Sequence, residues 1–221
     1  MPTKLDYDFF HSPCLEVAEN LVGKVLTHRL TDGTVLRLRI AETEAYCGEA
    51  DTACHAHKGR TNRTEVMYMD AGTIYIYLCY GMHWMLNIVT GDTEDPQAVL
   101  IRACVDAAGP GKLTKVLGIT GELNRSSILG DELWIEDDGF VCEVETDKRV
   151  GIGYASQEDQ DRPWRFKIKN PAQVFSGQGI FYANYITSPM TFRANTFAPS
   201  MASSVWKDAR LSLSWTEYIP T

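Results

Sequence analysis

Residues 35–46, VLRLRIAETEAY, contain the clearest structural pattern of the chain, because Leu36, Leu38 and Ile40 alternate with two arginines. Alternation with a period of two predicts a half-buried β-strand. The even positions share one face of this strand, and they are Leu36, Leu38, Ile40, Glu42, Glu44 and Tyr46. Because successive side chains of a strand point to opposite faces, we expect two carboxylates and a phenol on the core-facing side.

The segments around this strand predict a mainly antiparallel sheet. The turn signal Thr31-Asp32-Gly33 joins it to Val25 and Leu26 as a hairpin. Further strands are predicted at residues 73–80, 84–89, 98–105, 133–135 and 140–144. Helical spacing of apolar residues predicts short helices at residues 14–26, with a stop at Gly23, and at residues 112–119. We therefore expect an α+β fold: a single compact domain with a curved, mainly antiparallel sheet, hairpins and surrounding short helices.

Length and composition limit the class of protein. The chain has 221 residues, 44% of them hydrophobic, which is enough for one globular domain and excludes intrinsic disorder. No apolar run approaches the ~18 residues that a membrane span needs, and acidic residues near Met1 argue against a signal peptide. Six cysteines without a CxxC pair favour free thiols. We expect a soluble intracellular protein.

The net charge of −8 at first argues against a nucleic-acid partner. However, residues 126–147 include eight acidic residues and no Lys or Arg, so the rest of the chain has 21 residues of each sign. The acidic excess is local. The protein can be acidic in total and still offer a basic surface, which we expect on the side opposite the acidic segment.

Two groups of polar residues could do chemistry. Glu42 and Glu44 on a core-facing side need partners or a cavity, so they are either ion-paired structurally or tuned for acid, base or electrostatic work. The segment HAHKGRTNR (residues 55–63) has Lys58, Arg60 and Arg63 without an acid, so it is either a solvated loop or a phosphate-binding one. Its two histidines have no third ligand at a recognisable spacing, so no metal is expected.

Tyrosines gather on one predicted strand. Tyr75 and Tyr77 share a face, whereas Tyr80 points the other way at a tight turn beside Gly81. Such a stripe is usually core, although an aromatic side chain at a turn can also act as a wedge between DNA base steps. Asn87 and Arg102 lie within otherwise apolar strands, where each requires a polar partner.

Many short strings occur in an order that resembles the methylpurine (alkyladenine, 3-methyladenine) DNA glycosylase family. They are DFF (8–10), LVGKVL (21–26), IAETEAY (40–46), ACHA (53–56), GRTNR (59–63), YIYLCYGM (75–82) with Asn87, LIRA (100–103), GPGKL (109–113), RVGIGY (149–154) and RPWRF (162–166). The resemblance covers residues 8–175. It implies a domain over residues 1–175, and leaves residues 176–221 as a C-terminal extension of unknown role, which we expect to pack on the domain.

The resemblance implies a monofunctional glycosylase of base excision repair. Such an enzyme flips an alkylated or deaminated purine (3-methyladenine, 7-methylguanine, hypoxanthine or ethenoadenine) out of duplex DNA and hydrolyses its glycosidic bond. Glu44 would activate water, with Arg102 holding the same water and keeping Glu44 ionised. The substrate-binding residues implied are Tyr46, Ala53, His55, Tyr77, Asn87, Leu100 and Ile152. The DNA-binding residues implied are Tyr80, which would fill the vacated stack, and Lys58, Arg60 and Arg63.

Within this set, Tyr46 would stack on one face of the base, and His55 with Tyr77 on the other. The backbone at residues 53–55 would contact the base edge, and Asn87 would exclude guanine by crowding its 2-amino group. No cofactor is expected, and the partner would be double-stranded DNA bound by a monomer in the bacterial cytoplasm and nucleoid, or in the nucleus of a eukaryote. The alternatives are a catalytically inactive damaged-DNA-binding protein of the same fold and a hydrolase of free nucleosides or sugars.

Overall fold

The computed structural model describes residues 2–170. The predicted extension at residues 176–221 lies outside these described residues. The strands are β1 (Thr3–Lys4), β2 (Val25–Arg29), β3 (Val35–Cys47), β4 (Ile74–Cys79), β5 (His83–Thr90), β6 (Gln97–Cys104), β7 (Leu133–Asp137), β8 (Val144–Asp147) and β9 (Arg165–Ile168). The helices are α1 (Tyr7–Phe10), α2 (Cys14–Leu21), α3 (Pro110–Leu117) and α4 (Gln157–Asp161), together with the 3₁₀ turns η1 (Gly48–Ala50), η2 (His55–Lys58), η3 (Glu65–Tyr68) and η4 (Gly121–Leu123).

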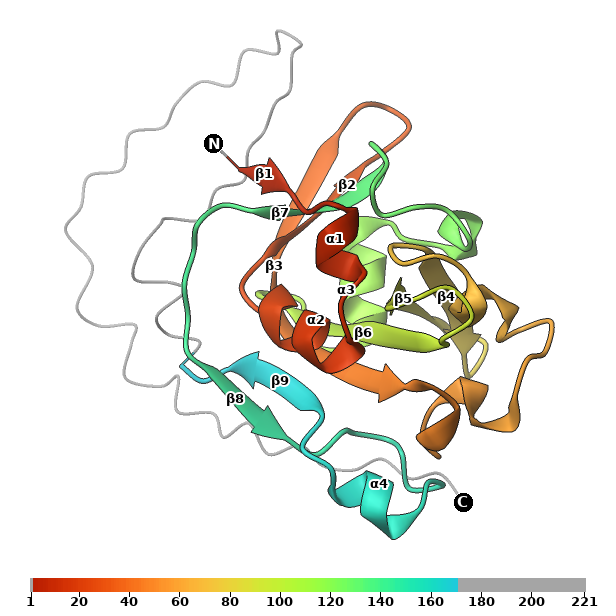
Figure 1. Cartoon of the computed structure of the whole chain (residues 1–221). Coiled ribbons are helices and arrows are strands. Elements are labelled where there is room, and N and C mark those ends of the chain that lie inside the picture. The colour runs from red at the N-terminus through yellow and green to blue at the C-terminus, as the bar shows by residue number, and fades with distance from the viewer. Residues whose placement is uncertain (1, 171–221) are drawn as a thin grey trace, which may run out of the picture. The chain divides into compact units, whose positions relative to one another are not determined.

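The strands form one sheet in the order β1-β7-β2-β3-β6-β5-β4, and β9 joins β3 and β8 at the side (Figure 1). Every strand pair is antiparallel. The long strand β3 is central, because its first half pairs with β2 and its second half with β6 and β9. The α+β class with a mainly antiparallel sheet is therefore confirmed.

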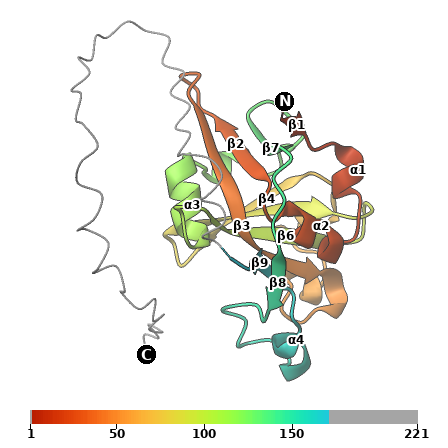
Figure 2. The same ribbon diagram turned by 90° about the vertical axis from the view of Figure 1, so that its left-hand side faces the viewer.

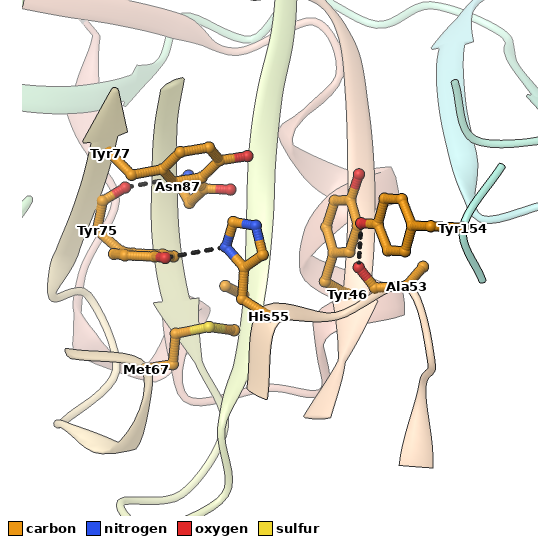
Figure 3. Close-up of a pocket in the computed structure, with 9 residues that line it drawn as sticks. Tyr46, Ala53, His55, Met67, Tyr75, Tyr77, Asn87 and Tyr154 are labelled. Carbon is orange, nitrogen blue, oxygen red and sulfur yellow. Dashed lines mark hydrogen bonds between the residues drawn. The ribbon is translucent and has the colours of Figure 1, made fainter. Parts of the chain in front are cut away.

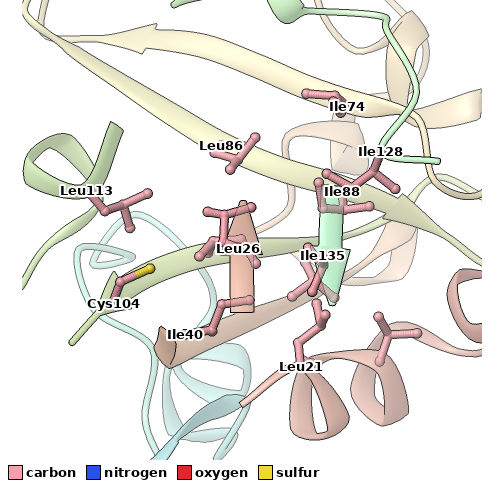
Figure 4. Packing of buried hydrophobic residues seen from close by; sticks show 14 of the residues in the cluster. Leu21, Leu26, Ile40, Ile74, Leu86, Ile88, Cys104, Leu113, Ile128 and Ile135 are labelled. Carbon is pink, nitrogen blue, oxygen red and sulfur yellow. The ribbon is translucent and has the colours of Figure 1, made fainter. Parts of the chain in front are cut away.

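The main core lies on one face of this sheet. Its members include Ile40 of β3, Ile101 of β6 and Ile88 of β5, all fully buried. Leu26 and Ile135 of β2 and β7 belong to the same cluster, so the sheet curves around its core (Figure 4). The amphipathic helices α2 and α3 pack their apolar sides against this face, α2 mainly on β3 and α3 mainly on β5, at separate places along the sheet (Figure 2).

An irregularity in β3 changes which side chains face the core. Ile40 and Thr43 are three residues apart, yet both are fully buried, and Thr43 Oγ1 donates to the carbonyl of Ala18 in α2. The β3–β6 register shifts on both sides of Glu42. Beyond this bulge the odd positions face the core, and the even positions Glu44 and Tyr46 face the opposite side. The prediction that the two carboxylates and the phenol lie on the core-facing side is therefore wrong, because simple alternation takes no account of a bulge.

Two predicted elements differ in extent from the observed ones. The first helix ends at Leu21, because Gly23 has a positive φ of 89° that closes the turn into β2. The strand predicted at residues 140–144 is wrong, since β8 begins only at Val144. The ring of Phe140 lies under the guanidinium of Arg39 at 4.2 Å, so this aromatic residue is satisfied by a side-chain contact rather than by strand pairing. The short elements β1, β9, α1 and α4 were not predicted.

Ion pairs neutralise much of the acidic segment 126–147. Asp137 and Asp138 pair with Lys24 and Arg39, and Glu136 pairs with Arg37. The remaining paired acids of this segment have basic partners in β1, in β9 or directly after β9, and they are Asp131, Glu143, Glu145 and Asp147. Most of the acidic residues in this segment therefore form ion pairs with basic residues of other segments. Within residues 2–170 no helix is long and apolar enough to cross a membrane.

Candidate active site

A pocket opens on the face of the sheet opposite the core. It has about 310 Å³ of free space, part of it open to solvent. Its lining residues are Tyr46, Ala53, His55, Met67, Tyr75, Tyr77, Asn87, Ala98 and Tyr154 (Figure 3). An apolar, aromatic pocket with a few convergent polar groups is typical of sites for small organic groups. Five of the seven predicted substrate-binding residues line it, and Leu100 and Ile152 lie buried nearby.

Strand register brings the site residues together. Glu44 of β3 pairs with Leu100 of β6, Leu100 pairs with Asn87 of β5, and Asn87 pairs with Tyr75 of β4. Directly paired residues of antiparallel strands point to the same face. The four side chains therefore form one row across the sheet, which we call the register row. Segments far apart in the sequence reach a common surface through backbone pairing alone.

Glu44 is the most enclosed polar group of the site, with no exposed surface. Its Oε1 accepts a hydrogen bond from the Val150 backbone N–H at 2.9 Å, and its Oε2 accepts one from the Tyr46 hydroxyl at 2.8 Å. Burial raises the pKa of Glu44, and Arg102, Val150 and Tyr46 offset this only in part. Burial and the charge of Glu44 also raise the pKa of Tyr46, so the phenol stays a donor.

Arg102 divides its charge between the two carboxylates of β3. Its Nε lies 3.0 Å from Glu42 Oε1 and 3.5 Å from Glu44 Oε1. Glu42 also accepts a hydrogen bond from Arg165 at 2.7 Å. The interpretation as a structural ion pair thus describes Glu42. Glu44 is buried, and its basic partner, Arg102, lies closer to Glu42. Arg102 lowers the pKa of Glu44 as expected, but burial has the larger effect.

One side of the pocket is an aromatic wall made of His55, Tyr75 and Tyr77. His55 Nδ1 lies 3.0 Å from the Tyr75 hydroxyl, and the rings of His55 and Tyr77 meet edge to face with centroids 4.7 Å apart. Burial and the nearby charge of Arg63 lower the pKa of His55 to about 4. His55 is therefore neutral at neutral pH.

The three predicted phosphate-binding cations have different surroundings. Arg63 lies over the Tyr77 ring at 4.9 Å, with Nη2 3.4 Å from His55 Nε2, so it backs the aromatic wall. Arg60 pairs with Glu94 and covers the ring of Tyr68. Lys58 is exposed, and it has no ion pair with any residue from 2 to 170. Contact of these side chains with phosphate stays a prediction.

The opposite side of the pocket rests on a buried ion pair that the sequence did not single out. Arg149 lies 5.0 Å from the Tyr46 ring and bonds to both carboxylate oxygens of Asp51. Asp51 in turn accepts the backbone N–H groups of Cys47 and Ala53, at 3.1 and 3.0 Å. The pair therefore fixes Tyr46 relative to Ala53. Asp51 has no flanking pattern that would reveal this role.

The loop at residues 149–154, between β8 and α4, completes this side. Tyr154 donates from its hydroxyl to the Ala53 carbonyl at 2.8 Å, although its side chain is 67% exposed. Ile152 packs against Ala53 and Tyr46. The sequence indicates no role for Val150 or Tyr154; the string RVGIGY contains both, but nothing local indicates that the loop returns to the pocket.

Asn87 is held by its amide nitrogen. Nδ2 donates to the carbonyl oxygens of Tyr75 at 3.1 Å and Met85 at 3.3 Å. The side-chain oxygen is therefore the atom that Asn87 can offer to, or press against, a ligand in the pocket (Figure 3). The polar partners that the sequence predicted for Asn87 are therefore backbone carbonyl groups of its own hairpin.

Tyr80 lies away from the pocket, at the connection between β4 and β5. Its side chain is 87% exposed, and its φ of 51° is unusual for a residue other than glycine. Met82 on the same connection is 70% exposed. The core interpretation of Tyr80 is therefore wrong, because the turn forces it outward. Met82 received no role from the sequence.

The two histidines of residues 55–57 do not converge with further ligands. His57 is exposed, and its Nδ1 lies 2.8 Å from the carbonyl oxygen of Glu49, whereas His55 faces the pocket. Within residues 2–170 no three His, Cys, Asp or Glu side chains are grouped so that they could hold a metal ion.

Comparison with known proteins places this geometry in a family. The family model described as "Methylpurine-DNA glycosylase (MPG)" matches residues 8–108 and 105–172. A protein of Psychrobacter cryohalolentis is 46% identical over 177 residues, which cover 66% of this chain and 84% of the relative. A protein of Methanocella arvoryzae is 44% identical over 187 residues, covering 75% and 92%. Both are named "Putative 3-methyladenine DNA glycosylase". The chain belongs to the methylpurine-DNA glycosylase family.

Proposed function

We propose that the protein is a monofunctional DNA glycosylase of base excision repair that removes alkylated or deaminated purines from duplex DNA. The observation that supports this most is the buried carboxylate of Glu44, held beside an aromatic pocket by Val150 and Tyr46. A base stacked within a duplex cannot reach such a pocket, so the damaged nucleotide has to leave the helix. The substrates proposed are 3-methyladenine, 7-methylguanine, hypoxanthine and ethenoadenine.

The pocket suits a flipped purine. Tyr46 stands on one side and the aromatic wall of His55, Tyr75 and Tyr77 on the other. Stacking on aromatic rings contributes about 1–3 kcal/mol per base and tolerates many bases. A neutral His55 also avoids repelling a cationic alkylated purine, which the π faces of the tyrosines attract. The Asn87 oxygen and the backbone near Ala53 are the polar groups that would select the base edge.

Glu44 provides the chemistry in this proposal. Cleavage of the glycosidic bond passes through a sugar with oxocarbenium character, which a nearby carboxylate stabilises. A raised pKa makes Glu44 a better proton acceptor for water than an ordinary carboxylate. The oxygen of water forms a bond to the sugar C1′, and its proton goes to Glu44. The bond from C1′ to the purine nitrogen breaks, and the purine leaves with the electrons of that bond. No lysine lines the described pocket, which fits a water nucleophile and the absence of strand cleavage.

Tyr80 would keep the gap in the duplex open. Its exposed ring at a turn with positive φ can insert into the base stack without refolding the hairpin. Lys58, Arg60 and Arg63 would contact phosphates near the pocket mouth, with Arg60 exchanging its partner Glu94 for DNA. We propose that the protein acts as a monomer, without a cofactor, in the bacterial cytoplasm.

The proposal is tested with the purified full chain. Labelled duplexes with a single hypoxanthine, ethenoadenine or 3-methyladenine are incubated with the protein and then treated with hot alkali, which cleaves the strand at an abasic site. We expect cleavage at the lesion only after alkali, and none in an undamaged duplex. Cleavage before alkali would contradict the monofunctional mechanism. Lesion binding without cleavage on any substrate would instead support the inactive DNA-binding protein, and release of base from free nucleosides alone would support the nucleoside hydrolase.

A further inference from the structure

Two cysteines outside the pocket lie unusually close together. Cys14 Sγ and Cys47 Sγ are 2.7 Å apart, and the structure has both as free thiols. A disulfide bond measures about 2.05 Å, so the two sulfurs need to approach by only a fraction of an ångström. Cys79, Cys104 and Cys142 show no comparable contact with another thiol in the part of the chain that the structure describes.

The backbone holds both sulfurs in this position. Cys14 is the first residue of α2, and its N–H donates to the side chain of Gln97 at 2.9 Å. Cys47 is the last residue of β3, and its N–H donates to Asp51 at 3.1 Å. The pair is therefore a fixed contact between two elements of the fold, 33 residues apart in the sequence.

The two thiols differ in their access to solvent. Cys14 is 1% exposed, whereas Cys47 is partly exposed. The hydrogen bond to Cys47 and burial raise the pKa of Cys14, so Cys14 is a poor first nucleophile toward an oxidant. Cys47 is the thiol that a small oxidant can reach, and Cys14 is the thiol placed to resolve the product.

We propose that Cys14 and Cys47 form an intramolecular disulfide when the protein meets a hydroperoxide. The Cys47 thiolate attacks one peroxide oxygen, so the O–O bond breaks and Cys47 becomes a sulfenic acid. The sulfur of Cys14 then attacks the Cys47 sulfur, the S–O bond breaks, and the hydroxyl leaves as water with the Cys14 proton. In total the two thiols lose two electrons and two protons, and hydrogen peroxide is reduced to two waters.

The bond would staple the pocket from behind. Cys47 directly follows Tyr46, and it shares Asp51 with Ala53 and Arg149. A cross-link from α2 to this point restricts the unfolded chain without moving the pocket, because the sulfurs are already in contact. We expect the oxidised protein to melt roughly 5–10 °C higher than the reduced protein, with unchanged excision activity.

The test treats the full chain with hydrogen peroxide, blocks free thiols, and counts them after denaturation. We expect the loss of two of the six thiols and a dithiothreitol-sensitive peptide that joins Cys14 to Cys47. Cys14→Ser and Cys47→Ser should each retain five thiols and show no rise in melting temperature, whereas the control Cys142→Ser should lose two. If Cys14→Ser fails to fold, Cys47→Ser alone is sufficient, because Cys47 is the less buried of the two cysteines and its substitution disturbs the core less.

Three outcomes would overturn the proposal: all six thiols persist, Cys47 oxidises to a sulfinic acid, or Cys47 joins Cys54 instead. Cys54 is the competing partner because it is a free cysteine only seven residues after Cys47. The measurement counts thiols rather than excised bases. Its result is therefore independent of the proposed glycosylase activity.

Discussion

The two faces of the four strands β3, β6, β5 and β4 bury different chemistry, although each carries an apolar cluster. One face presents Val99, Ile101 and Ile88 to the core, all fully buried apolar residues. The other presents Glu44, Asn87 and the tyrosines of the pocket, from alternate positions of the same strands. Neighbouring residues of one strand thus serve opposite purposes: burial of apolar area on the core face stabilises the fold, and the pocket face buries polar groups at a cost in free energy.

The contrast shows where the protein tolerates unfavourable interactions. The Glu44 carboxylate has no surface exposed to bulk solvent, and Asp51 forms a buried ion pair with Arg149, an arrangement that seldom adds net stability. A continuous apolar core on the other side of the same backbone compensates for both. Substitutions on the core face should therefore change stability, and those on the pocket face should change activity.

The largest effect is expected for Glu44→Gln. Removing the proton acceptor should lower the rate of excision by about 10²–10⁴-fold. The free energy of unfolding should not fall, because the amide removes a charge that burial disfavours. Single-turnover excision and urea denaturation measure the two quantities. Glu42→Gln is the matched control, because this carboxylate two residues away is only 20% exposed but is paired with arginines, and the variant should retain most activity. Equal losses in both variants would contradict the assignment.

The next effect separates two adjacent residues of β6. Ile101→Ala on the core face should lower the free energy of unfolding by about 2–5 kcal/mol. Excision by the folded protein at low temperature should remain close to that of the wild type. Leu100→Ala on the pocket face should reduce excision in addition to stability, because Leu100 lies between Glu44 and Asn87 in the register row. If the two variants had the same activity, the two faces would not be functionally distinct.

A smaller effect concerns His55 and pH. A pKa lowered to about 4 means that the unfolded chain binds a proton below pH 6.5 that the folded protein does not take up. Stability should therefore fall as the pH drops from about 6.5 toward 4, with a loss from this group on the order of 2 kcal/mol at pH 5. Urea denaturation at pH 7 and pH 5 measures it. His55→Gln should remove this part of the pH dependence, and His57→Gln, an exposed histidine two residues on, should not.

The smallest effect is expected for Tyr154→Phe. The variant keeps the ring at the pocket edge and removes only the hydrogen bond to the Ala53 carbonyl. A neutral hydrogen bond of this kind contributes about 0.5–1.5 kcal/mol, so kcat/KM should fall by about 2–10-fold. Tyr7→Phe in α1, also an exposed tyrosine, is the control and should have no effect. An unchanged kcat/KM for Tyr154→Phe would show that the contact does not position Ala53.

Much of the fold followed from local pattern. Both hairpins, the helices at Cys14 and Pro110 and the strand of Arg102 were predicted within a few residues, because apolar periodicity and turn chemistry are local properties. The prediction of a strand at Phe140 was wrong, since the ring of Phe140 contacts Arg39, which lies 101 residues earlier in the sequence. Part of the site could be predicted from its tyrosines, His55 and Glu44. Asp51, Val150 and Tyr154 act through contacts that no local pattern encodes.

The sequence by itself determined which chemistry the protein has available: an α+β sheet of alternating strands, surplus tyrosines, a basic loop and the carboxylate pair Glu42 and Glu44. Only the tertiary structure decided how that chemistry is used. The bulge near Glu42 turned Glu44 and Tyr46 away from the core, and the loop at residues 149–154 returned to enclose them. The physical reason is that side-chain type is a local property, whereas burial and electrostatic surroundings depend on which distant segments pack together.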